Sequence, residues 1–178
     1  MPARSPVLLL GAAALLGACS SSGGKQAGPS GTLTASWSGP DTLAGQLAAP
    51  ARAGWCAGTG RLEVLATKDD QAVGLAIFPA ESLEPGEYAV FDPGIDTARR
   101  PAVAGAARWY TDAAIVGYQS DSGQFTLSRD ATGGLGAEFG FRLVDLTRED
   151  TIRLTGTMTG LVPGPCPDDS LPNPDRAD

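Results

Sequence analysis

Apolar and polar residues alternate with a period of two along most of the chain beyond residue 30. The alternation is clearest in residues 135–145, where apolar side chains at odd-numbered positions are separated by glycine or charged residues. Residues 151–161 repeat it, with Ile152, Leu154 and Met158 on one side and mostly threonine on the other. This period is typical of strands that bury one face of an antiparallel sheet.

Shorter runs of the same kind predict further strands. They span residues 32–38, 61–67, 71–78, 86–92, 102–111, 114–120 and 124–129. Residues 68–70 predict a hairpin turn, and the Ser-Asp-Ser-Gly run at 120–123 predicts a turn between two strands. Residues 41–53 are rich in alanine and glycine and are expected to form a strand or a loop.

The count comes to about nine or ten strands at the short spacing of sandwiches and barrels. We therefore expect an all-β fold, either an antiparallel β-sandwich or a closed barrel. The 24 glycines and 14 prolines supply the turns that such a fold needs, and 42% hydrophobic residues are enough for a core.

The first residues have the features of an export leader. Residues 1–18 carry a single positive charge at Arg4 and an apolar run at 7–16, which is too short to span a membrane. Small residues then precede Cys19, and Leu16-Gly17-Ala18-Cys19 resembles the lipobox of bacterial lipoproteins. The alternative is an ordinary cleaved signal in which Cys19 is incidental.

The lipobox resemblance implies that residues 1–18 are a signal peptide and that Cys19 carries lipid. Two or three acyl chains would make the membrane anchor practically permanent. In lipoproteins of double-membraned bacteria, Asp after the lipidated Cys favours retention in the inner membrane. Ser20 stands there in this chain, so the outer membrane is expected if the organism has one.

Three further segments follow the leader. Residues 19–30 form a Gly/Ser-rich tether, which as a flexible coil would span about 18 Å. Residues 31–166 form the β domain, and residues 167–178 form an acidic, proline-rich tail that we expect to be disordered. With its repeated glycine-apolar strands and the spacing of Gly156 and Gly160, the domain resembles small uncharacterised secreted β domains of bacterial lipoproteins. That resemblance implies no activity.

The chain has three cysteines, and an odd thiol is a liability in an oxidising compartment. Assigning Cys19 to lipid leaves Cys56 and Cys166 to form a disulfide. The bridge requires the first and last strands to lie close together. Catalytic or metal-binding roles for these cysteines are the alternative, although no Cys-x-x-Cys motif is present.

Composition excludes several functions. The net charge is −7 and no stripe of Lys or Arg exists, which argues against nucleic acid and against a polybasic membrane contact. No histidine is present, which removes Ser-His-Asp and Cys-His hydrolases and histidine-ligated zinc. No nucleotide-binding glycine motif is complete. We expect no cofactor and no catalytic residues.

The remaining candidate sites are weak. Asp92 and Asp96 are candidate Ca²⁺ ligands, as is the pair at 168–169, because the cation prefers hard oxygen donors. Trp109 and Tyr110 are candidates for a ligand-stacking surface, although consecutive strand residues face opposite sides. The acids clustered at 81–87 are interpreted as exposed turn residues.

Three functions remain open at this point. The leading hypothesis is a non-catalytic envelope lipoprotein with a binding or structural role towards an envelope protein or glycan. The second is a carrier that holds a small apolar ligand inside a barrel. The third is a glycan hydrolase that uses two carboxylates.

Overall fold

The structure is a computed structural model that describes residues 31–39, 44–110, 112, 114–145, 147 and 149–166. The predicted signal peptide, Cys19, the predicted tether, the acids at 168–169 and the rest of the predicted tail lie outside these residues. The longer strands are β1 (Gly31–Ser38), β2 (Ala44–Cys56), β3 (Arg61–Lys68), β4 (Gln71–Phe78), β7 (Ala102–Tyr110), β8 (Ile115–Arg129), β9 (Leu135–Asp145) and β10 (Thr151–Leu161). Three two-residue strands are β5 (Gly86–Glu87), β6 (Ala89–Val90) and β11 (Gly164–Pro165).

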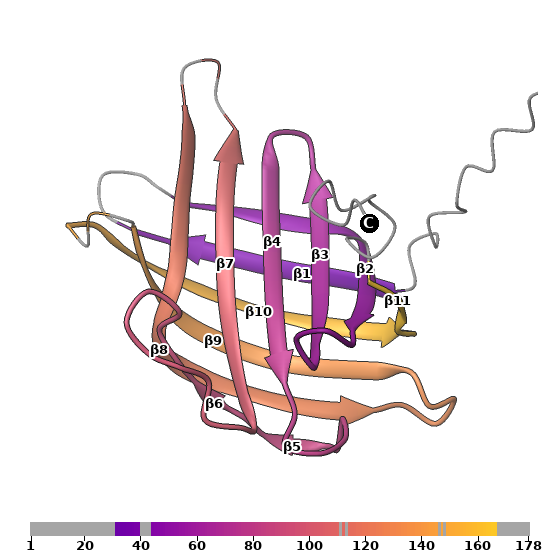
Figure 1. Ribbon diagram of the computed structural model, residues 1–178. Coiled ribbons are helices and arrows are strands. Elements are labelled where there is room, and N and C mark those ends of the chain that lie inside the picture. The colour runs from indigo at the N-terminus through magenta and orange to yellow at the C-terminus, as the bar shows by residue number, and fades with distance from the viewer. Residues whose placement is uncertain are drawn as a thin grey trace, which may run out of the picture.

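The eight longer strands close into an antiparallel barrel (Figure 1). Each strand pairs with the next along the chain, and β1 pairs with β10 to complete the circle. This closure confirms the predicted all-β class and selects the barrel over the sandwich. The hairpin predicted at 68–70 is also confirmed, since β3 and β4 pair through Lys68 and Gln71.

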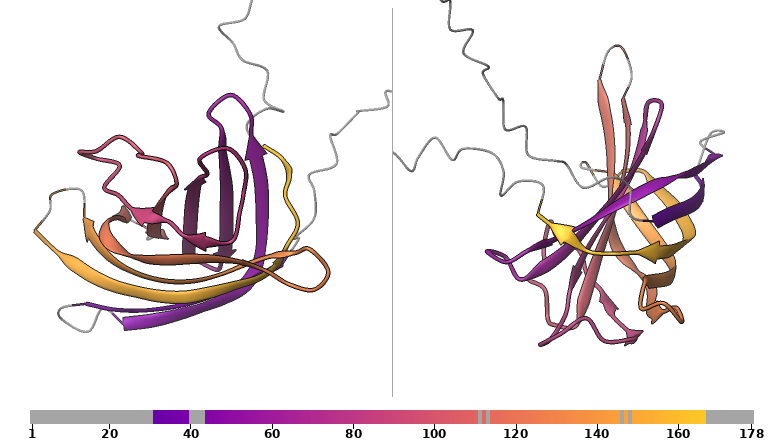
Figure 2. Two further views of the ribbon diagram at one scale, coloured as in Figure 1. Left: turned by 90° about the horizontal axis from the view of Figure 1, so that it is seen from below. Right: turned by 90° about the vertical axis from the view of Figure 1, so that its right-hand side faces the viewer.

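The barrel is folded at two corner strands, β2 and β8. β2 pairs with β1 from Ala44 to Ala51 and with β3 from Ala51 to Cys56. β8 pairs with β7 near its start and with β9 along the rest of its length. As a result β3, β4 and β7 cross the direction of β1, β9 and β10 (Figure 1), and the latter three form one curved layer in the left view of Figure 2.

The turn predicted at 120–123 is wrong, because β8 continues through it as one strand of 15 residues. The register with β9 shifts between Ser120 and Ser122, which is the signature of a β-bulge. The bulge reverses the alternation, so that Tyr118 and Ser120 are buried before it and Phe125 after it. The buried Ser120 hydroxyl donates to the Phe91 carbonyl at 3.0 Å and accepts the Gly105 N–H at 3.0 Å.

Two other predicted boundaries change. The strand expected at 86–92 is two short pieces, because β5 pairs with β8 whereas β6 pairs with β7. The ambiguous segment at 41–53 contributes most of β2. In both places the pairing partners decide the boundary.

Apolar side chains fill the inside of the barrel. The inward faces expected for β9 and β10 are confirmed, with Phe141 and Leu154 among the fully buried residues. Near the top of the hairpin between β7 and β8, Trp109 packs edge-on against Trp37 at 5.3 Å and against Tyr118 at 5.5 Å between ring centroids. No helix among the described residues is long and apolar enough to cross a membrane.

Cys56 and Cys166 form the predicted disulfide, which joins residues 110 apart in the chain. β11 runs parallel to the end of β2 beside Gly54 and Trp55 and brings Cys166 next to Cys56. The bridge therefore ties the last described residues of the chain to a corner strand.

Candidate functional site

The outward side of β1, β8, β9 and β10 carries three rows of directly opposed residues, all polar except Gly140, which we call the polar face. The rows are Ser38–Arg153–Arg142–Ser122, Ser36–Thr155–Gly140–Gln124 and Thr34–Thr157–Glu138–Thr126. Each row crosses four neighbouring strands because the pleat points alternate residues of each strand outward. The residues come from two widely separated parts of the chain, one near residue 35 and one from 122 to 157.

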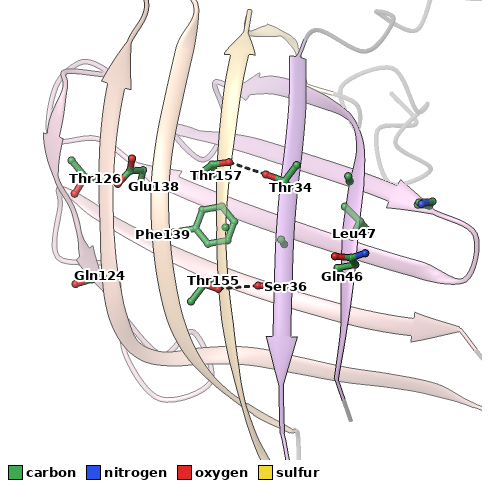
Figure 3. Close-up of a pocket in the computed structure, with 14 residues that line it drawn as sticks. Thr34, Ser36, Gln46, Leu47, Gln124, Thr126, Glu138, Phe139, Thr155 and Thr157 are labelled. Carbon is green, nitrogen blue, oxygen red and sulfur yellow. Dashed lines mark hydrogen bonds between the residues drawn. The ribbon is translucent and has the colours of Figure 1, made fainter. Parts of the chain in front are cut away.

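Hydroxyl groups pair across the seam between β1 and β10. The Thr34 and Thr157 hydroxyl oxygens are 2.8 Å apart, and those of Ser36 and Thr155 are 3.1 Å apart (Figure 3). Both pairs are exposed, and each hydroxyl can donate one hydrogen bond and accept two. The seam therefore retains hydrogen-bonding capacity for a ligand.

The polar face is hollowed rather than smooth. A hollow of about 640 Å³ lies over the hydroxyl pairs and reaches Gln46 on β2 and Lys68 on β3. A second of about 860 Å³ adjoins it at Gln124 and Thr155 and lies over the arginine row. A third of about 410 Å³ adjoins the first at Glu138 and includes Gly136. We call these three adjoining hollows the polar groove.

Glycine contributes to the groove on β9. Gly136 and Gly140 occupy outward positions on either side of Glu138, so that strand presents few side chains there. The three atoms nearest to an added Cβ at Gly140 would be side-chain atoms of Gln124 and Thr155, at 3.7–3.8 Å. The site is open enough for a larger residue to be built into the groove.

Charges on the polar face are few. Arg142 forms an ion pair with Asp121, and its side chain is 56% exposed. Arg153 lies directly opposite Arg142 on the neighbouring strand. Glu138 supplies the carboxylate of the third row, beside Thr157.

Trp109 and Tyr110, the predicted stacking pair, are not brought together on one surface. Trp109 is partly buried in the aromatic cluster with Trp37 and Tyr118. Tyr110 is 44% exposed, and its N–H donates to the Asp70 carbonyl at 2.8 Å. Trp109 thus contributes to the core, while Tyr110 alone remains available to a ligand at this hairpin.

Asp92 is buried, with 4% of its surface exposed, and holds a turn. Its carboxylate accepts the Gly94 N–H at 2.8 Å, and its carbonyl accepts the Asp96 N–H at 2.8 Å. Among the described residues, the one cluster of three potential metal ligands is Cys56, Glu63 and Cys166, of which the cysteines are disulfide-bonded. The Ca²⁺ site at Asp92 and Asp96 stays a prediction.

The acids at 81–87 surround a separate hollow of about 320 Å³ beside Tyr88.

Elsewhere, two aspartates have a lowered pKa because turn groups donate hydrogen bonds to them. The Thr132 hydroxyl lowers the pKa of Asp130, and the Thr147 hydroxyl lowers the pKa of Asp145. Burial raises the pKa of Tyr88 and Tyr118.

The polar face is the feature that the sequence did not reveal. Alternation in 135–145 and 151–161 indicates which residues point outward, but the register between strands is what makes neighbours of Arg142 and Arg153.

Comparison of the chain with protein-family models, with curated proteins and with solved structures finds no match to any of them.

Proposed function

We propose that the protein is an exported lipoprotein, held to a membrane by lipid on Cys19, that acts as a non-catalytic binding module. The polar groove is its binding surface, and the barrel is the rigid scaffold that presents it. One observation carries the proposal: two adjoining hollows of about 640 and 860 Å³ lie outside the barrel on a polar face, over a core packed with apolar side chains.

The same observation favours this function over an apolar-ligand carrier. A carrier needs an internal cavity lined by apolar groups. In this barrel the inward positions are filled, for example by Phe125, Phe139 and Phe141, whereas the groove is lined by threonine, serine and glutamine. The geometry supports binding of a polar molecule on the outside.

The groove also lacks the arrangement that a two-carboxylate hydrolase requires. Such enzymes place two acids on opposite sides of a sugar, roughly 5–9 Å apart. The three rows of the polar face contain one carboxylate, that of Glu138. Asp130 also lines the groove, but its carboxylate accepts hydrogen bonds from Thr132 and Gly134, which lower its pKa, whereas a general acid needs a raised pKa. The residues directly opposite Glu138 are Thr157 and Thr126, whose hydroxyl groups suit hydrogen bonding to a ligand, and this supports a binding role.

The anchor is tested by metabolic labelling with a fatty acid. We expect the Cys19→Ser variant to lose the acyl label and to leave the membrane fraction, because no other thiol is free when Cys56 and Cys166 are paired. Ser20→Ala is the matched control and should keep both label and location. Label retained by Cys19→Ser would overturn the anchor.

The binding surface is tested by photo-cross-linking in intact cells. A photoreactive amino acid at Thr157, in the groove, is expected to form adducts, whereas the same group at Arg108 is not. Arg108 is also exposed but lies on β7, in the other half of the barrel. Equal yields at the two positions, or adducts at Arg108 alone, would contradict a binding role for the groove.

A further inference from the structure

Two arginines stand side by side in the largest hollow of the polar face. Arg142 on β9 and Arg153 on β10 are directly opposite each other, and both line the hollow of about 860 Å³. Like charges in directly opposed positions destabilise a sheet. The pairing is therefore unfavourable for the fold alone and needs another explanation.

Only part of this positive charge is neutralised within the described chain. Asp121 pairs with Arg142, and the described residues provide no ion pair or hydrogen bond to the Arg153 side chain. In the hollow over the arginine row, one positive charge thus remains without an ion-pair partner among the described residues, in a protein whose net charge is −7. A single anionic group that contacts both guanidinium groups would relieve their repulsion.

The groups around the arginines indicate what kind of molecule carries that anion. Ser38 and Ser122 flank the arginines in the same row, and Gln124 and Thr155 begin the next. Each can donate and accept hydrogen bonds, as the hydroxyl groups of a sugar require. The paired hydroxyls of the adjoining hollow continue this chemistry along the groove.

We propose that the polar groove binds an acidic glycan, with a sugar carboxylate on Arg153 and Arg142 and the sugar hydroxyls on the Ser/Thr seam. The inference rests on the proposed binding function and names its ligand class. A planar guanidinium matches a carboxylate through two parallel hydrogen bonds. The groove mixes a few positive side chains with the carboxylates of Glu138 and Asp130, which suits a sparsely charged glycan better than a nucleic acid, since a nucleic acid requires many positive charges.

Binding is measured with the full-length lipidated protein in detergent micelles and a fluorescent hexasaccharide in which every second sugar is a glucuronate. The methyl-esterified hexamer, which has the same sugars without the charge, is the ligand control. Arg153→Gln is expected to raise the Kd for the acidic hexamer at least about tenfold, which corresponds to about 1.4 kcal/mol. Arg108→Gln, which removes the same charge from β7, should leave the Kd within about twofold.

A variant that fills the groove tests the role of its shape separately from the role of its charge. Gly140→Tyr adds a ring to the groove at a position where the three atoms nearest to a Cβ are side-chain atoms at 3.7–3.8 Å, and it should abolish binding of both hexamers. Circular dichroism melting checks that each variant is folded. We expect Gly140→Tyr to lose binding of both hexamers. We expect Arg153→Gln to lose affinity for the acidic hexamer in particular.

Three results would overturn the inference. In the first, Arg153→Gln and Arg108→Gln weaken binding of the acidic hexamer equally. In the second, the wild type binds the acidic and esterified hexamers with equal affinity. In the third, the folded wild type does not bind the acidic hexamer. None of these results refutes the binding function itself. Cross-linking at Thr157 decides that independently, because the photoreactive group captures a ligand of any chemistry.

Discussion

Replacing both Cys56 and Cys166 with serine should lower the free energy of unfolding by about 4–5 kcal/mol. The bridge joins residues 110 apart, and in the chain-entropy account a loop of that length restricts the unfolded chain by about this much. Both cysteines are also buried, at 5% and 6% exposure, so the serine hydroxyls would have to be accommodated away from water. Urea unfolding monitored by circular dichroism measures the loss.

Two controls accompany that measurement. In a reducing agent, the free energy of unfolding of the wild type should fall by a similar amount, because the disulfide is removed without a change of sequence. Cys19→Ser should lose nothing, since Cys19 precedes the barrel. A loss below about 1 kcal/mol in the double serine variant would show that barrel closure alone restrains the chain, because removing a native disulfide from a small secreted domain usually costs 2–5 kcal/mol.

The second large effect is expected at the bulge of β8, where Gly123→Ala should destabilise the barrel by about 3 kcal/mol. Gly123 has φ of +146°, which side chains rarely adopt. Its added Cβ would lie 2.2 Å from the Gly140 carbonyl oxygen and 2.9 Å from the Phe141 Cα. Both are backbone atoms, so β8 and β9 would have to separate.

Gly140→Ala is the matched control for this variant. Gly140 lies on the facing strand, and the three atoms nearest to its added Cβ are side-chain atoms at the ordinary contact distance of 3.7–3.8 Å. Gly140→Ala should be neutral or stabilise the fold by up to about 1 kcal/mol through the unfolded state. Thermal melting compares the two variants. Equal losses in both would mean that glycine flexibility, and not the close approach of the strands, matters at the bulge.

The sequence is sufficient to predict the class of fold, because alternation survives wherever a strand has one buried face. Alternation predicted the buried faces of residues 135–145 and 151–161. The number of cysteines, with Cys19 assigned to lipid, predicted the pairing of Cys56 with Cys166. Prediction failed where tertiary contacts reverse the pattern. At 120–123 the bulge shifts burial from even-numbered to odd-numbered positions. Turn-forming residues at such a break in the alternation are compatible with a bulge and with an ordinary turn, so the sequence does not distinguish the two.

The candidate site was harder to predict for a related reason. An outward Arg142 and an outward Arg153 are each visible in the alternation, but a shift of one strand by two residues keeps both outward and separates them. Register depends on packing along the whole barrel, including the close approach of Gly156 to the Thr34 carbonyl. Local pattern carries no record of such contacts.

The closure of β1 onto β10 has a mechanical consequence. β1 is the strand that leads from the tether, and it is held on both sides along its length, by β2 and by β10. Ladder hydrogen bonds lie perpendicular to their strands, so tension along β1 loads both ladders in shear, many bonds at a time, and does not open them one by one. If Cys19 carries lipid as proposed, a ligand seated on the seam between β1 and β10 would pull on the same strand that leads to the anchor. Force between anchor and ligand would then pass through a strand that is supported on both sides.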